Sequence, residues 1–237
     1  MAVNAKKTPN IEKLTVKGPL SERVYKELKK ALLDGQFAPG DLLPEDFLTD
    51  ATGASRTPVR EALMRLQGDG LVKIIPRRGA RVLELDAVEL GELVEARGLL
   101  ETSYLERAME KIPRAKFEKI RHDMNLIINE METLDTGSSE WAQKRLDYSK
   151  LDFEFHHLLV EAVGNRFLLK YYDEILEKVI LYSHHTVIKY PEAFLQSAYE
   201  HDGILNALLN HDGSQAKRLI IHHFEKLNNR MKSSRIG

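Results

Sequence analysis

The chain has 237 residues, 43% of them hydrophobic, so it can bury one large core or two smaller ones, and we do not expect extensive disorder. It contains no cysteine, which excludes disulfides and thiolate ligands and leaves His, Asp and Glu to hold any metal. No stretch reaches the roughly 18 apolar residues of a membrane span, and residues 1–17 are too polar for a secretory signal, so we expect a cytoplasmic protein with no membrane partner.

The net charge of −1 conceals an asymmetry along the chain. Residues 1–84 contain 15 Lys and Arg against 11 Asp and Glu, whereas residues 85–237 contain 20 against 25. Ordinary fluctuation between domains produces such differences. The asymmetry also fits a basic nucleic-acid-binding module joined to an acidic domain.

The N-terminal region begins with a segment that has no apolar period. Residues 1–18 hold four lysines and are expected to form a mobile tail. From residue 21 to 33 apolar side chains recur at helical spacing, which predicts a first helix with Ser21 as its N-cap and Gly35 as its terminator.

Two further helices are predicted after the Pro39-Gly40 turn. A short helix is expected over residues 45–51, and after Gly53 another helix opens at Thr57 and Pro58, with threonine as the cap and proline where its missing N–H costs little. The apolar positions of this last helix lie on one face: Val59, Ala62, Leu63 and Leu66. The opposite face is therefore free for a partner.

A basic hairpin completes this region. Residues 71–75 and 80–83 are predicted to be short strands, joined by a tip, residues 76–79, that carries two arginines. Three helices and such a hairpin indicate a winged helix-turn-helix, expected to occupy residues 19–84.

Beyond residue 85 the sequence has helical periods only. They are interrupted at turn-forming segments and predict six or seven helices over residues 85–237. The expected fold class is therefore mainly α, with a winged helix-turn-helix followed by an all-α bundle.

The candidate DNA contacts lie on the outer face of the third helix and on the hairpin. A recognition helix fits the major groove, where Arg makes a two-pronged contact with guanine and Thr contacts base or phosphate, which singles out Arg56, Thr57 and Arg60. The hairpin can reach a minor groove or the backbone through Arg77, Arg78 and Gly79. An ordinary solvated charged face is the alternative interpretation.

Several stretches of this region form a recognisable pattern: SRTPVREAL at 55–63, GLV at 70–72, PRRGA at 76–80, Pro39-Gly40 and LPE at 43–45. Together they closely resemble the GntR family of bacterial regulators over about residues 21–82. The resemblance implies a homodimer that binds a short palindromic operator in double-stranded DNA.

The resemblance also assigns roles to individual residues. Arg56 and Arg60 would read bases, and Ser55 and Thr57 would hold phosphate or base edges. Gly79 would mark the wing tip. Asp46 departs from the pattern, because some members place a base-reading Arg there. An Asp at that position can accept a hydrogen bond from cytosine or repel phosphate, so it is left outside the contact set.

Helical phase sorts the nine histidines of the chain. Asp152 and His156 lie one turn apart on the flank of a buried stripe, a spacing that lets two side chains chelate one ion. His201 and His223 fall on the inward faces of two later helices. Hydrogen-bonded core histidines are the alternative, but three imidazoles and a carboxylate suit zinc, nickel, manganese or iron.

This half of the chain carries its own sparse pattern: Glu95-Ala96-Arg97, DFEFH at 152–156, Gly164-Asn165, Glu200-His201, Asp212, Ala216 and His223. It resembles the FCD-type ligand-binding domain of the FadR subgroup of GntR regulators over residues 87–230. The resemblance implies metal binding by Asp152, His156, His201 and His223, with open metal positions that accept a carboxylate or hydroxy acid.

Arg97 is a separate clue to an anion. It lies within an inward stripe formed by Leu90, Val94, Tyr104 and Ala108. An inward Arg needs a negative partner, which is either Glu101 one turn away or the carboxylate of an effector.

The sequence thus favours a DNA-binding regulator in which a small organic acid bridges the metal and Arg97. Two alternatives stay open. A regulator can carry a purely structural metal and sense no acid. A metal-dependent enzyme is the other, although no well-placed general base accompanies the motifs.

Overall fold

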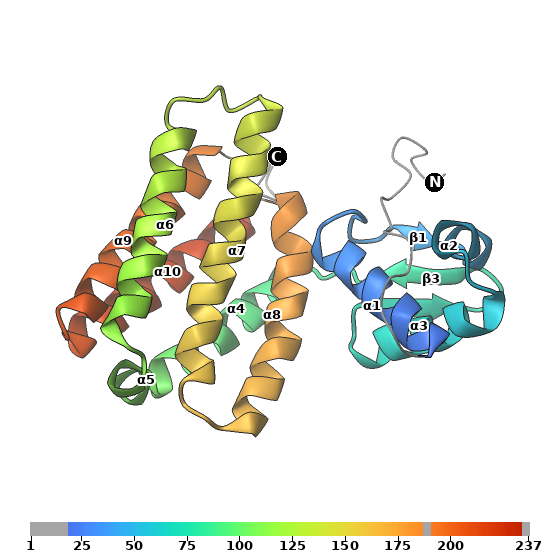
Figure 1. The fold of residues 1–237 in the computed structure, drawn as a ribbon, viewed down its shortest axis with the longest axis horizontal. Helices are drawn as coiled ribbons and strands as arrows, with labels where there is room; N and C mark the ends of the chain where they lie inside the picture. Colours follow the sequence, from blue (N-terminus) through green and yellow to red (C-terminus); the bar gives the residue numbers. More distant parts are fainter. Residues whose placement is uncertain (1–18, 187–190, 234–237) are drawn as a thin grey trace. The chain divides into compact units, whose positions relative to one another are not determined.

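The structure is a computed structural model that describes residues 19–186 and 191–233. The expected tail, residues 1–18, lies outside the described residues. The described part contains ten helices and one three-stranded sheet (Figure 1), which confirms the predicted fold class. The described residues divide into two compact units, one of residues 19–86 with 177–186 and the other of residues 87–176 with 191–233.

Three helices and three short strands follow one another in the N-terminal part: α1 (Leu20–Leu33), β1 (Leu42–Leu43), α2 (Glu45–Thr52), α3 (Arg56–Gly68), β2 (Val72–Ile75) and β3 (Gly79–Val82). The antiparallel sheet has the order β1-β3-β2, with Ile75 opposite Gly79 at the hairpin end and Leu43 opposite Ala80. The sequence did not predict β1, because two residues are too few to display an alternating pattern.

Two predicted helix caps are wrong. The N-cap of α1 is Pro19, so Ser21 lies inside the first turn. The N-cap of α3 is Ser55, so Thr57 is also inside its helix. The first-turn N–H groups of a helix have no partner within it, and Pro58 is therefore tolerated deeper in this turn than the sequence analysis assumed.

Gly79 has a structural requirement at the start of β3. Its φ is +104°, and a Cβ placed there would lie 2.1 Å from the carbonyl oxygen of Leu43. Only glycine combines this backbone angle with such a close approach. The residue therefore allows the hairpin to pack against β1.

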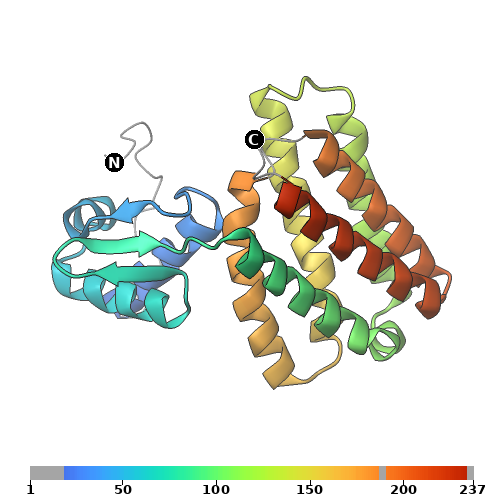
Figure 2. The same ribbon diagram turned by 180° about the vertical axis from the view of Figure 1, so that it is seen from behind.

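Seven helices follow, the upper end of the predicted number: α4 (Ala87–Ser103), α5 (Leu105–Lys111), α6 (Arg114–Met131), α7 (Ser139–Glu161), α8 (Arg166–Thr186), α9 (Pro191–Leu209) and α10 (Gly213–Ser233). Helix α10 packs against α4 and α9, and α6 packs against α7 and α9 (Figures 1 and 2). Large side chains from these helices fill the bundle core, among them Met124, Phe155, Leu205 and Ile220.

Tyr104 does not belong to the inward stripe in which the sequence analysis placed it. Helix α4 ends at Ser103 and α5 begins at Leu105, so the phase of α4 does not continue through this residue. Tyr104 is 40% exposed.

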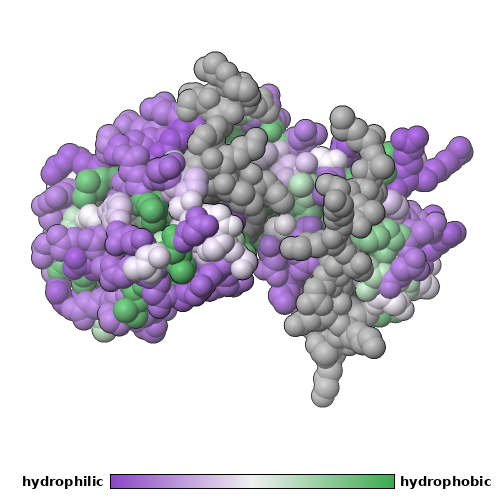
Figure 3. Space-filling view, turned by 90° about the horizontal axis from the view of Figure 1, so that it is seen from above, coloured by the Kyte–Doolittle hydropathy of each residue, from purple (hydrophilic) through white to green (hydrophobic). Residues whose placement is uncertain are grey.

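Polar residues make up most of the coloured surface in Figure 3, with hydrophobic residues scattered among them. Within the described ranges, no helix has both the length and the apolar content that a membrane span requires.

Candidate DNA-binding surface and metal site

The outer face of α3 is exposed as predicted by its apolar spacing. Val59, Ala62, Leu63 and Leu66 are buried. The side chains of Ser55, Arg56, Thr57 and Arg60 are exposed.

Two carboxylates at the start of α2 hold the arginines of this face. Arg56 donates from Nη2 to Oδ1 of Asp46 over 2.9 Å. Arg60 donates from Nε and Nη2 to Glu45, each over 2.9 Å, and these hydrogen bonds raise the pKa of Arg60. Asp46, whose role the sequence left open, is therefore the partner of a candidate base-reading residue.

The hairpin presents its cations at the tip of the sheet. Arg77 and Arg78 are exposed, whereas Gly79 is buried. Arg77 has a φ of +62°, which few residues other than glycine adopt, and Arg78 donates its backbone N–H to the carbonyl of Ile75 over 3.0 Å. The tight turn directs two charged residues outward from a short, antiparallel pair of strands.

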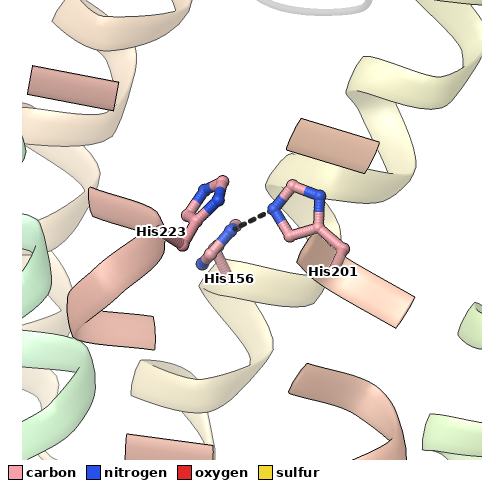
Figure 4. Close-up of side chains that lie close together, drawn as sticks. All are labelled: His156, His201 and His223. Atoms are coloured by element: carbon pink, nitrogen blue, oxygen red, sulfur yellow. Dashed lines mark hydrogen bonds between the residues drawn. The ribbon is translucent and has the colours of Figure 1, made fainter. Parts of the chain in front are cut away.

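Three histidines meet inside the helical bundle. His156 comes from α7, His201 from α9 and His223 from α10, and all three are buried (Figure 4). One ring nitrogen from each lies within 4.8 Å of the others, and Nε2 of His156 is 3.1 Å from Nε2 of His201. The structure brings together the three imidazoles that helical phase selected.

The opposite ring nitrogen of each histidine is held by the protein. Each Nδ1 has its own hydrogen-bond partner: Glu101 at 2.5 Å for His156, the Tyr148 hydroxyl at 3.1 Å for His201, and Glu200 at 2.8 Å for His223. Such partners fix ring orientation and leave Nε2 for the interior of the cluster. Metal-ligating histidines characteristically have this arrangement.

Asp152 faces the same point from α7. Its Oδ1 lies 3.0 Å from Nε2 of His201 and 3.3 Å from Nε2 of His156, yet this buried atom accepts no hydrogen bond. Burial favours the neutral acid, but the two histidines outweigh it and hold the pKa of Asp152 well below its usual range. A charged oxygen and two imidazole nitrogens that converge without hydrogen bonds to Asp152 fit a shared cation.

The protonation of the histidines depends on their carboxylate neighbours. Burial disfavours the charged form of His156, but Glu101 and Asp152 raise its pKa to about 9. Burial and the neighbouring His201 lower the pKa of His223 to about 4. The cluster therefore contains one strongly basic imidazole and one that stays neutral at physiological pH.

Arg97 is buried beside this cluster on α4. Its Nη2 is 3.4 Å from Oε1 of Glu101, which also accepts a hydrogen bond of 2.7 Å from Tyr172. Glu101, the internal partner predicted for Arg97, is thus present beside it. However, Nε and Nη2 of Arg97 are buried and have no hydrogen bond, so donors remain for a second anion.

Three residues that orient the site were not predicted from the sequence: Tyr148, Tyr172 and Glu200. Tyr148 precedes Asp152 by one turn of the same helix, a spacing that signals a shared face. Glu200 was quoted only as part of a motif. Tyr172 lies on a different helix from the groups that it orients, and no local pattern identifies it.

Comparison with known proteins identifies the families to which the two parts of the chain are similar. The family described as "Bacterial regulatory proteins, gntR family" matches residues 20–82, and the family described as "FCD domain" matches residues 92–226. The HTH-type transcriptional repressor RspR of Escherichia coli K12 is 25% identical over 222 residues, covering 92% of this chain and 91% of RspR. The gluconate operon transcriptional repressor of Bacillus licheniformis is 27% identical over 175 residues, covering 73% and 68% of the two chains.

A solved structure supports the fold. E. coli McbR/YncC superposes with a TM-score of 0.71 at 20% identity and covers 92% of this chain and 99% of its own. The relatives are transcription regulators, which confirms the expectation that the chain is not an enzyme. The chain belongs to the GntR family of bacterial transcription regulators and carries an FCD domain.

Proposed function

We propose that this regulator binds a palindromic operator as a homodimer and is controlled by a small organic acid at a metal held in its FCD domain. The observation that carries the proposal is the convergence of three buried histidines whose Nδ1 atoms are all engaged by the protein. This role also implies a cytoplasmic location, where the operator would be.

The DNA-reading part of the proposal involves α3 and the hairpin. Arg56 and Arg60 would contact bases in the major groove, with Ser55 and Thr57 at base edges or phosphate. Their exposure and position at the start of α3 support these roles. The wing residues, Arg77, Arg78 and Gly79, would contact an adjacent minor groove or the backbone.

The metal would be held by Asp152, His156, His201 and His223. Nitrogen and oxygen ligands of this kind suit zinc, nickel, manganese or iron. When bound, such an ion supplies a Lewis acid that accepts a carboxylate or hydroxyl oxygen. The Oδ1 atom of Asp152, which is buried without a hydrogen bond, supports the assignment from the residues themselves.

Arg97 would bind the carboxylate of the effector. A guanidinium offers a paired fork that matches a carboxylate, and two of the Arg97 nitrogens have no hydrogen bond. A relative that represses a gluconate operon fits this chemistry, since gluconate is a hydroxy acid. Effector binding would change the spacing of the two DNA-reading helices in the dimer, and a coupling of about 1 to 3 kcal/mol suffices for control.

A melting-temperature screen tests this proposal. Purified protein would be heated with small carboxylic and hydroxy acids, with and without prior chelation, because a ligand of the folded state raises the transition. We expect one class of acid to stabilise the protein only when metal is present. If chelation lowers the melting temperature and no acid raises it, the metal is purely structural and the effector proposal fails.

A further inference from the structure

The inner face of α7 continues beyond the metal site. Tyr148, Arg145 and Trp141 precede Asp152 at helical spacing, and these three residues are buried. Side chains three or four residues apart share a helix face, so they form one row. Arg145 and Trp141 have no part in the sites described above.

Arg145 is a buried residue whose charge has no counter-ion in the described part of the chain. The residue is 4% exposed, and its guanidinium forms neither an ion pair nor a hydrogen bond with residues 19–183 or 191–230, whose side chains are described. Burial alone lowers its pKa. By contrast, Arg121 pairs with Asp202 and Arg230 with Glu200.

Trp141, one turn from Arg145 along α7, carries a buried donor without a partner. Its Nε1 is buried and has no hydrogen-bond partner within the described part of the chain. The Trp141 and Tyr148 rings both pack edge-on against Phe194, with centroids 6.0 and 5.4 Å away. A buried indole N–H normally has an acceptor and a cation in a protein interior normally has a counter-ion, so these two residues on one helix face fit a bound anion.

We propose that the guanidinium of Arg145 and the Nε1–H of Trp141 bind a small carboxylate at a site separate from the histidine cluster. The guanidinium provides a paired fork and the indole adds one donor. Tyr148 lies between the two sites along α7, with its hydroxyl held by Nδ1 of His201 and by the carbonyl of Ala198. The inference goes beyond the proposed function, because this site requires neither metal nor DNA.

Trp141 is the only tryptophan of the chain, so its emission reports on the environment of this site. Full-length protein, stripped of metal by a chelator, would be titrated with sodium acetate and sodium succinate, with sodium chloride at equal ionic strength as the control. We expect a saturable change for a carboxylate and not for chloride. Arg145→Met should weaken the affinity about tenfold or more, whereas Arg218→Met, at an exposed position, should not.

A melting curve in anion-poor buffer provides a second readout. Arg145→Met removes an unpaired buried charge and should raise the melting temperature, while added carboxylate should stabilise only proteins that keep Arg145. A lower melting temperature for Arg145→Met would mean that the guanidinium has a partner in the protein, which overturns the proposal. A fluorescence response that requires metal and disappears in His201→Ala would assign the carboxylate to the histidine site and also overturn it.

Discussion

At the scale of single residues, the candidate reading arginines are oriented before any DNA is present. Asp46 and Glu45 hold Arg56 and Arg60 through hydrogen bonds of 2.9 Å. Both arginines are exposed, so each pair adds little to stability. Their effect is to hold the arginine side chains in place, because an arginine restrained by a carboxylate loses less side-chain freedom when it contacts a base.

Arg60 provides the sharpest test of the recognition surface. Arg60→Ala should weaken binding to an operator selected from randomised duplexes by about 1–3 kcal/mol, because a two-pronged base contact is lost. Metal content should not change. Arg65→Ala is the matched control on the same helix, since Arg65 pairs with Glu22 and stacks on Tyr25 instead. Equal operator affinity for Arg60→Ala and wild type in a fluorescence-anisotropy titration would contradict the assignment.

At the scale of elements, the sequence predicted those with a long apolar period and missed those fixed by tertiary contacts. The inward phase of His156, His201 and His223 followed from helical spacing, because each lies well inside a long helix. Strand β1 was missed because its two residues form a strand only by pairing with β3. The orienting role of Tyr172 was missed for a similar reason, since its partner Glu101 lies 71 positions away.

Gly79 tests the close contact between the hairpin and β1. Gly79→Ala should destabilise the winged helix by roughly 2–4 kcal/mol, because the new Cβ would meet the backbone of Leu43 at an unfavourable positive φ. Gly68→Ala is the matched control, as a Cβ there meets nothing within 4 Å at the end of α3. In urea unfolding, the Gly68→Ala protein should be as stable as wild type or slightly more stable. Equal losses for the two variants would exclude the steric explanation.

At the scale of the whole molecule, the histidine cluster joins distant parts of the chain. Its members come from α7, α9 and α10 (Figure 4). Their Nδ1 partners include Glu101 on α4. A metal bound there would link three helices directly and a fourth through a hydrogen bond. Because an unfolded chain holds no such site, metal binding would contribute directly to the stability of the bundle.

His201 and His222 separate this metal effect from the loss of any histidine. His201 is buried in the cluster, whereas the His222 side chain is 58% exposed beside His223 on α10. At metal concentrations about 100 times the dissociation constant, binding should stabilise wild type and His222→Ala by about 2.7 kcal/mol, and chelation should remove this gain. His201→Ala should lose most of the response, because one ligand is missing and the others remain buried. Calorimetric melting with and without chelator measures the difference, and a full chelation response in His201→Ala would place the metal elsewhere in the protein.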